Sequence, residues 1–437
     1  MEPLAEQLNQ TIQGESPALY EMLSEVGRDI YFPSKGILSQ AAEAKTKATH
    51  FNATIGTALE NGEAMHLDCL MCQLPGFSPD EALLYAPSPG LPELRKAWFA
   101  KLLHDNPDLQ GKALSLPIVA SGLSHALSLI GDAFIDKGDL LIYPDKNWGN
   151  YALNYVVRHQ AKPVYFPLFD NGNFNLKGLG DCLQNAIANG ARKAVVLLNF
   201  PNNPTGYAPT EDECVRISKL LLDAADSGLK LVVIVDDAYY GLFHKDQVCR
   251  QSLFTKLAGR HANLLAIKAD AATKEVYVWG LRVGFLTFSI GGVANDSPVF
   301  EALNAKIGGL IRAGISNCSA LSQRLVLNAL KSPEFYTQRA QKAAVMKERA
   351  LEVEKVLADG KYACAWDAYP FNSGYFMCLK IKGISARELR VYLLEKYGVG
   401  TIAINDTDLR IAFSCINTQD VQELFDTILL AWKDLAK

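Results

Sequence analysis

Three short runs of apolar, mostly branched residues limit what this chain can fold into. They cover residues 140–143, 194–198 and 231–235, and Pro, Asn or Asp follows each run directly. A strand that is apolar on both sides is expected in a parallel sheet whose two faces are covered by helices. The runs therefore predict the central strands of such a sheet.

Helical patterns lie between these runs. In residues 211–226, Val215, Leu220 and Leu221 are predicted to form one apolar stripe, and Thr210 is placed to cap the first turn. This alternation of strands and helices predicts an α/β fold with a doubly wound, mostly parallel sheet. In such a sheet, ligands bind at the carboxyl ends of the strands.

The length of 437 residues allows two or three domains. A helical pattern extends to about Glu25, and a long amphipathic one covers residues 333–357. We expect the long helix to connect the sheet domain to a smaller α+β domain. The predicted division is a large domain of residues 65–345 and a small domain of residues 1–64 and 346–437.

The charge and the cysteines exclude several classes of protein. A net charge of -4 gives no basic surface for nucleic acid or for an anionic membrane, and no apolar stretch reaches the ~20 residues of a membrane span. The first ten residues, MEPLAEQLNQ, do not resemble a secretory signal, so we expect a cytoplasmic protein. His66, Cys69 and Cys72 have zinc-like spacing but lack a second ligand pair nearby, so no metal site is predicted.

Four motifs follow one another at the predicted strand ends. Residues 199–206 read Asn-Phe-Pro-Asn-Asn-Pro-Thr-Gly, residues 236–239 read Asp-Asp-Ala-Tyr, Thr273 precedes Lys274, and residues 282–284 read Arg-Val-Gly. Each motif alone is weak, because turn residues such as Asn, Pro and Gly are common. Together and in this order they resemble the fold-type I, class I aminotransferases, the family of aspartate and aromatic amino-acid transaminases. The resemblance extends from about residue 52 to residue 410.

This resemblance implies pyridoxal 5'-phosphate as the cofactor, held as a Schiff base on Lys274. A lysine freed from that bond serves as a mobile base. Asp236 corresponds to the family's carboxylate that keeps the pyridine nitrogen protonated; Asp237 is its rival by adjacency alone. Asn203 and Tyr239 correspond to the residues that hydrogen-bond the phenolic oxygen of the ring.

The cofactor phosphate is expected to bind where a strand leads into a helix. Residues 121–127 resemble the family's phosphate loop, with the Leu123 amide and Ser124 as ligands, and Arg282 supplies a bidentate cation. The family often has a hydroxyl residue three positions before the lysine, where this chain has Ala271. One phosphate ligand is therefore predicted to be missing or replaced.

Trp148 corresponds to the aromatic residue that stacks on the cofactor ring. Tyr151, three residues later, stands where aspartate aminotransferases often have histidine. We therefore expect the contacts that support Asp236 to differ from those of aspartate aminotransferases.

Substrate residues come from distant parts of the chain. Arg410 resembles the arginine that binds the substrate carboxylate, and Gly56 lies in a segment that resembles the loop closing over the substrate. Tyr85 resembles the tyrosine that reaches the phosphate in the neighbouring subunit. Arg312 resembles the arginine that crosses the dimer interface to bind a side-chain carboxylate. The resemblance thus implies a homodimer with shared active sites.

The predicted reaction is transfer of an amino group between an L-amino acid, dicarboxylic or aromatic, and a 2-oxo acid such as 2-oxoglutarate. A β-lyase or a decarboxylase on the same fold stays open as an alternative, because one fold supports several reactions. A transcription regulator with an aminotransferase-like domain is disfavoured, since little chain precedes residue 52 and it holds no basic recognition helix.

Overall fold

The computed structural model describes residues 37–54, 58–60, 63–72, 76–295 and 297–437, with isolated positions at 3, 6 and 10. Its largest element is a seven-stranded sheet with the order β4-β12-β11-β10-β9-β5-β6. These strands are β4 (Ile118–Ala120), β5 (Leu140–Pro144), β6 (Lys162–Phe166), β9 (Lys193–Asn199), β10 (Lys230–Asp236), β11 (Leu264–Ala271) and β12 (Gly284–Ile290). The three predicted central strands are β5, β9 and β10, each longer than its predicted run.

The sheet is mixed. Strands β6, β5, β9, β10 and β11 pair in parallel, whereas β12 is antiparallel to both β11 and β4. The predicted doubly wound, mostly parallel α/β fold is confirmed. The β11–β12 connection is short and contains Lys274 and Arg282, so the chain reverses at the edge of the sheet where the parallel strands end.

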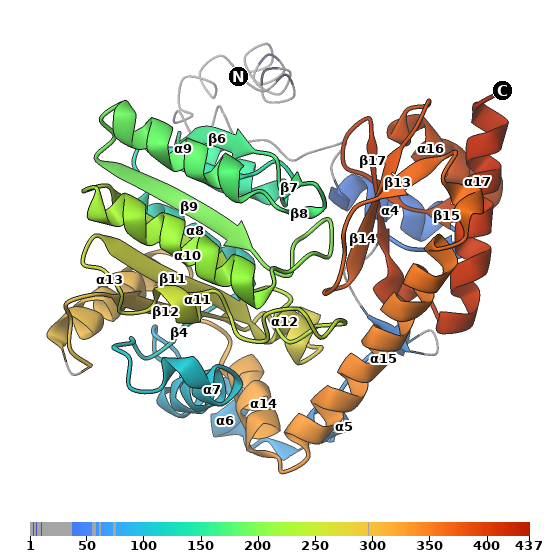
Figure 1. The fold of residues 1–437 in the computed structure, drawn as a ribbon. Helices are drawn as coiled ribbons and strands as arrows, with labels where there is room; N and C mark the ends of the chain where they lie inside the picture. Colours follow the sequence, from blue (N-terminus) through green and yellow to red (C-terminus); the bar gives the residue numbers. More distant parts are fainter. Residues whose placement is uncertain are drawn as a thin grey trace.

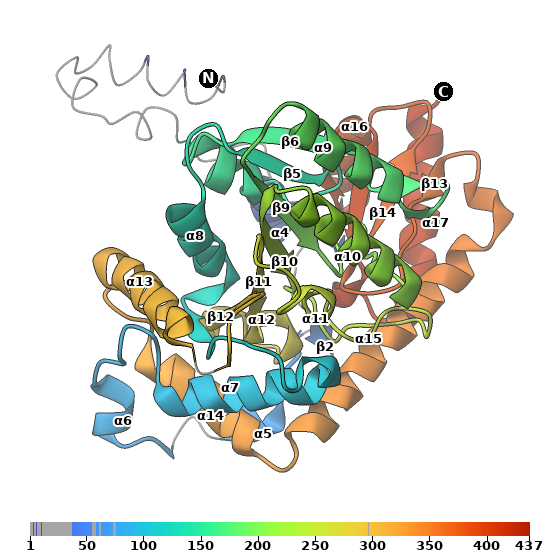
Figure 2. The same cartoon turned by 60° about the vertical axis from the view of Figure 1, so that its left-hand side comes forward.

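Helices cover both faces of the sheet, which explains the uniformly apolar strands. On one face lie α9 (Leu176–Ala188) and α10 (Glu211–Asp226), side by side in Figure 1. The other face carries α8 (Gly122–Phe134) and α13 (Pro298–Gly314), seen in Figure 2. Helix α7 (Pro92–Asp105) packs at the β12 end of the sheet, where Trp98 stacks on Phe285. Neighbouring residues of one strand enter different cores: Val196 packs with the α9 and α10 side, and Val195 with the α8 side.

Helix α10 has the predicted bounds and the predicted cap. The Thr210 hydroxyl accepts a hydrogen bond from the Glu213 amide, and the Glu213 carboxylate accepts one from the Thr210 amide. The predicted apolar stripe is partly wrong, because Val215 is 49% exposed. The buried face instead runs through Cys214, Ile217 and Leu221, which follow the spacing of three to four residues more closely.

A four-stranded sheet forms a second layer, with the order β13-β14-β17-β16. Its strands are β13 (Trp366–Ala368), β14 (Phe376–Ile381), β16 (Ile402–Ala403) and β17 (Asp408–Ala412). Helices α16 (Ala386–Tyr397) and α17 (Val421–Leu435) pack against each other beside it, and α4 (Ile37–Lys47) lies against β16. Strand β1 (Phe51–Asn52) pairs in parallel with β15 (Val399–Gly400), which joins the two ends of the chain in this layer.

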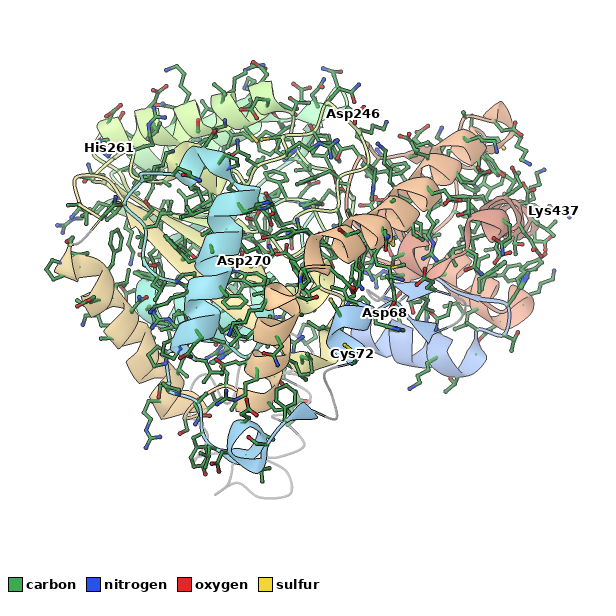
Figure 3. All side chains as sticks on the ribbon, turned by 90° about the horizontal axis from the view of Figure 1, so that it is seen from below. Asp68, Cys72, Asp246, His261, Asp270 and Lys437 are labelled. Carbon is green, nitrogen blue, oxygen red and sulfur yellow. The ribbon has the colours of Figure 1, made fainter. Side chains whose placement is uncertain are left out.

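Helix α15 (Phe335–Leu357) follows α14 (Ala320–Lys331) and runs from the large sheet to the four-stranded one, as Figure 3 shows from below. It matches the predicted long connecting helix. The predicted boundary between residues 345 and 346 falls inside this helix, and the division into two domains stays a prediction. The helix predicted up to Glu25 lies outside the continuous stretches that the structure describes.

The remaining strands and α-helices are short. They are β2 (Leu59–Glu60), β3 (Glu63–Ala64), β7 (Phe169–Asp170), β8 (Asn173–Phe174), α5 (Asp68–Met71), α6 (Pro79–Leu83), α11 (Phe254–Leu257) and α12 (Ala272–Glu275). None of the helices in the described part of the chain has the length and apolar character of a membrane span.

Candidate active site

A cavity of about 320 Å³ lies between the two sheets, at the carboxyl ends of the parallel strands. Strand β10, helices α8 and α12, and strands β14 and β17 all contribute to its wall. Nine of the predicted residues line it: Leu123, Ser124, Trp148, Asn203, Asp236, Tyr239, Lys274, Arg282 and Arg410. The fold therefore brings together residues that are separated by almost 300 positions in the sequence.

Asp236 is the last residue of β10 and is buried. Its carboxylate accepts hydrogen bonds from the Tyr151 hydroxyl at 2.6 Å, the Ala238 amide at 3.0 Å and the Asn199 side-chain amide at 3.3 Å. Burial raises the pKa of Asp236, and the hydrogen bond from Tyr151 opposes that rise most strongly. A fixed carboxylate at the cavity wall is suited to pair with a protonated ring nitrogen.

Tyr151 is the hydrogen-bond partner of Asp236 at the position where histidine was expected from aspartate aminotransferases. It is buried, and both burial and the neighbouring Asp236 raise the pKa of its phenol well above the ordinary value. The phenol therefore stays neutral and donates to Asp236 over the whole physiological pH range, whereas a histidine, with its ordinary pKa near ~6.5, changes its charge within that range. The sequence predicted that the contacts of Asp236 differ from those in aspartate aminotransferases. The difference is that a neutral phenol donates the hydrogen bond.

Lys274 lies in α12, directly after β11, and is partly exposed to the cavity. Its Nζ lies 4.8 Å from the centroid of the Tyr239 ring, and the Tyr375 hydroxyl donates to the Lys274 carbonyl at 3.2 Å. Desolvation by the surrounding protein lowers the pKa of Lys274 to about 8, with Asp236 opposing and Arg282 contributing. A lysine with such a pKa presents a far larger fraction of free amine near neutral pH than an ordinary lysine does.

Strand β4 leads into α8 through a tight turn at Gly122. Gly122 has a φ of +75°, and a Cβ atom there would lie 2.3 Å from Arg282 Nη2, so only glycine leaves the arginine in this position. Leu123 and Ser124 occupy the first turn of α8, where helix geometry leaves amides without helical partners. These groups fit the phosphate of the predicted cofactor.

Thr273 adds a hydroxyl group to the same cavity. It is buried, and its Oγ1 has no hydrogen-bond partner in the described structure. Ala271 ends β11 and provides no hydroxyl, as expected from the sequence. An unsatisfied buried hydroxyl in the wall is a fitting donor for a bound oxyanion.

Arg410, on β17, forms the opposite wall. Its guanidinium donates to Asn203 Oδ1 at 2.9 Å and to the Thr54 carbonyl at 3.0 Å, and it lies 4.1 Å from the centroid of the Phe376 ring. Because Asn203 accepts through Oδ1, its Nδ2 is the end that is able to donate to a ligand. The backbone amide of Asn203 donates to Asn199 Oδ1 at 2.8 Å, and this hydrogen bond holds the turn that follows β9.

Trp148 lies in the loop after β5 and is half-buried. Its ring meets the Tyr151 ring edge to face, with centroids 5.6 Å apart. This places an aromatic surface in the cavity wall close to Asp236, as its predicted stacking role requires.

Tyr85 and Arg312 do not line this cavity. Tyr85 is 90% exposed, and Arg312 is exposed near the end of α13, where it donates to the Ser316 hydroxyl. The segments that follow them are joined, because the Ser88 hydroxyl donates to the Ser316 carbonyl at 2.8 Å. Gly56 lies outside the described residues.

Several residues of the site were not identified from the sequence. Asn199 begins the motif that contains Asn203 and could have been recognised as the last residue of a strand. Thr54 and Phe376 contribute a backbone carbonyl and a ring face, and their residue types carry no sequence signal for these roles.

Among the residues that the structure describes, no group of three or more His, Cys, Asp or Glu side chains could hold a metal ion. His66 Nε2 lies 3.6 Å from Oδ1 of Asp68, a residue of α5. Asp68 and Cys72 are labelled in Figure 3.

Comparisons with known proteins agree with this geometry. The family described as aminotransferase class I and II matches residues 67–428. A probable aspartate/prephenate aminotransferase of Aquifex aeolicus is 27% identical over 251 residues, 57% of each chain. A histidinol-phosphate aminotransferase of Caldanaerobacter subterraneus is 27% identical over 282 residues, 64% of this chain and 66% of its own length. The chain thus spans less than two thirds of the length of these two relatives.

The fold is also that of solved aminotransferases. The crystal structure of an aminotransferase from Anaerococcus prevotii superposes with a TM-score of 0.79 at 23% identity, covering 91% of this chain and 95% of the other. Since the family match includes both sheets and all nine cavity residues, this chain belongs to the class I and II aminotransferases, a family of pyridoxal-phosphate-dependent enzymes.

Proposed function

We propose that this chain is an aminotransferase that exchanges an amino group between an L-amino acid and a 2-oxo acid. The observation that supports this most is the meeting of Lys274, Asp236 and Arg410 in one cavity, since they correspond to the base, the ring carboxylate and the substrate cation. Pyridoxal phosphate, when bound, supplies the electron sink that stabilises negative charge on the Cα atom of the substrate.

The residues of the chain have separate tasks in this proposal. Arg410 binds the substrate α-carboxylate and orients Cα towards Lys274, whose Nζ takes up the Cα proton and returns it. Asp236 keeps the ring nitrogen protonated, and Tyr239 and Asn203 donate to the phenolic oxygen. Burial raises the pKa of Tyr239, so this residue donates as a neutral phenol.

The substrate class is proposed to be dicarboxylic or aromatic amino acids, with glutamate and 2-oxoglutarate as the common pair. The exposed Arg312 is free to reach a side-chain carboxylate in a neighbouring subunit, and a charge-assisted hydrogen bond of this kind contributes about 1.5–3 kcal/mol. Relatives act, by their names, on aspartate or prephenate and on histidinol phosphate, so the family admits more than one substrate.

We propose further that two copies of the chain share their active sites. Leu83, Leu84 and Tyr85 form an apolar exposed run at the end of α6, with exposed fractions of 79%, 61% and 90%. Such a run is unusual on a monomer and fits a surface covered by a partner. Tyr85 would then reach the phosphate site of the second copy. A cytoplasmic location completes the proposal.

The test is the absorption spectrum of the cofactor-loaded protein before and after addition of L-glutamate without a 2-oxo acid. Conversion of the cofactor to its amine form with one equivalent of 2-oxoglutarate is the expected result, and Lys274→Ala is expected to abolish turnover. Retained transamination in that variant would refute the assignment. A yellow protein that ignores glutamate would direct the search towards neutral amino acids, or towards the β-lyase and decarboxylase reactions.

A further inference from the structure

An ion pair connects the two sides of the cavity. Lys146 lies in the loop after β5 that carries Trp148, and Asp408 is the first residue of β17, the strand that carries Arg410. Lys146 Nζ lies 3.0 Å from Asp408 Oδ2; the Asp408 side chain is fully buried and that of Lys146 is 15% exposed. The pair therefore joins the predicted ring-stacking wall to the predicted carboxylate-binding wall.

The Asp408 carboxylate is hydrogen-bonded on both oxygens. The Tyr369 and Thr407 hydroxyls each donate to Oδ1 at 2.9 Å, and the Asn405 side-chain amide donates to Oδ2 at 2.9 Å. This set of donors holds the carboxylate in one orientation on the four-stranded sheet. Of the named partners of the Asp408 carboxylate, only Lys146 comes from the loop after β5, a strand of the large sheet.

Lys146 is held in place from its own side as well. Asn202, next to Asn203, donates to the Lys146 carbonyl at 3.1 Å, and Lys146 Nζ lies 3.1 Å from Asp145 and 5.3 Å from the Tyr369 ring centroid. Asp408 and Arg410 are two residues apart on β17, so their side chains project from the same face of the sheet. A shift of Asp408 therefore moves Arg410 with it.

A contribution to the folding stability of the protein is a weak explanation for this ion pair. Removing two charges from water is costly, and a buried ion pair is often no more stable than an apolar pair of the same volume. A directional contact between two elements has a different effect, because it favours one relative position of the two sides.

We propose that Lys146 and Asp408 are positioning residues that set the place of Arg410 relative to the cofactor cavity. The pair acts on the binding of the substrate carboxylate through Arg410 and touches neither substrate nor cofactor. This inference rests on the proposed function, in which Arg410 binds that carboxylate.

The test compares the holoenzyme with Lys146→Met, Asp408→Asn and the double variant. Lys193→Met is the matched control, because Lys193 also forms ion pairs, at 3.2 Å with Asp136 and 2.7 Å with Asp139, at the start of β9 and away from the cavity. The measurements are KM and kcat for the amino acid, the Kd of an unreactive carboxylate from the change in cofactor absorption, the Kd of the cofactor, and the melting temperature.

In both single variants and the double variant, KM and the carboxylate Kd are expected to rise by roughly 3- to 30-fold, with kcat and the cofactor Kd nearly unchanged. The double variant leaves no unpaired buried charge, so a wild-type melting temperature together with weak carboxylate binding would separate positioning from loss of folding. A folded double variant with wild-type KM and carboxylate Kd would overturn the proposal. A wild-type protein that binds carboxylates but does not transaminate would contradict the proposed function instead, and the carboxylate Kd values would still test the ion pair.

Discussion

At the scale of single residues, the surroundings of Lys274 control its protonation. Because desolvation lowers the pKa of Lys274 to about 8, its amine is mostly neutral above that pH and mostly charged below it. Only the neutral amine attacks an aldehyde, so the rate at which added pyridoxal phosphate attaches to the cofactor-free protein should rise with pH and level off above about 8. Stopped-flow absorption measures this rate, and Lys274→Arg is the control. A midpoint near the ordinary value of 10.5 would contradict the prediction.

Tyr151 provides a second prediction at this scale. Tyr151→Phe removes one of three donors to Asp236, and a hydrogen bond to a charged group contributes about 1.5–3 kcal/mol, so kcat/KM should fall by roughly 10- to 100-fold. The lost donor also raises the pKa of Asp236, so activity should be lost at a higher pH on the acid side.

Tyr155→Phe is the control for this prediction. Tyr155 is also buried, but its hydroxyl donates to the Leu127 carbonyl at 3.1 Å rather than to Asp236. The pH profile of Tyr155→Phe should match that of the wild type. An unchanged acid side in Tyr151→Phe would show that the remaining donors, Asn199 and Ala238, are sufficient.

At the scale of elements, the turn from β4 into α8 contains the proposed phosphate site. Gly122→Ala places a Cβ atom against Arg282, whereas Gly111 has a similar φ of +78° and open space around it. Both substitutions should destabilise the protein by about 1 kcal/mol through their left-handed backbone. Only Gly122→Ala should also weaken cofactor binding. Equal cofactor Kd values in the two variants, measured by fluorescence titration beside thermal unfolding, would refute the proposed phosphate site.

At the scale of the whole molecule, the position of Arg312 outside the cavity of its own chain makes the dimer testable. If Arg312 serves the site of the partner, Lys274→Ala and Arg312→Ala protomers should complement each other, because a mixed dimer contains one site with both residues intact. Mixing the inactive Lys274→Ala protein with the impaired Arg312→Ala protein should then give more transamination of glutamate than either protein alone. Activity that stays absent in verified mixed dimers would show that Arg312 has no role across the interface.

The sequence by itself predicted the central strands, helix α10 with its Thr210 cap, and the residues at the strand ends. These features depend on local chemistry: the apolar character of a strand, the spacing of a helix face, and the side chain that follows a buried strand. Asp236 could be located in this way because it follows a buried strand, whereas Lys274 was identified through the order of motifs that resembles the aminotransferase family. The two residues lie at one site because the parallel strands β10 and β11 end at the same edge of the sheet.

Only the tertiary structure decided which side chains meet. The antiparallel pairing of β12 with β4, the Tyr151 hydroxyl on Asp236, the Thr54 carbonyl on Arg410 and the pairing of Lys146 with Asp408 join segments far apart in the chain. No periodicity or local propensity encodes such contacts, because they depend on how whole elements pack. The sequence therefore determined the chemistry available to the site, and the packing of the two sheets determined its geometry.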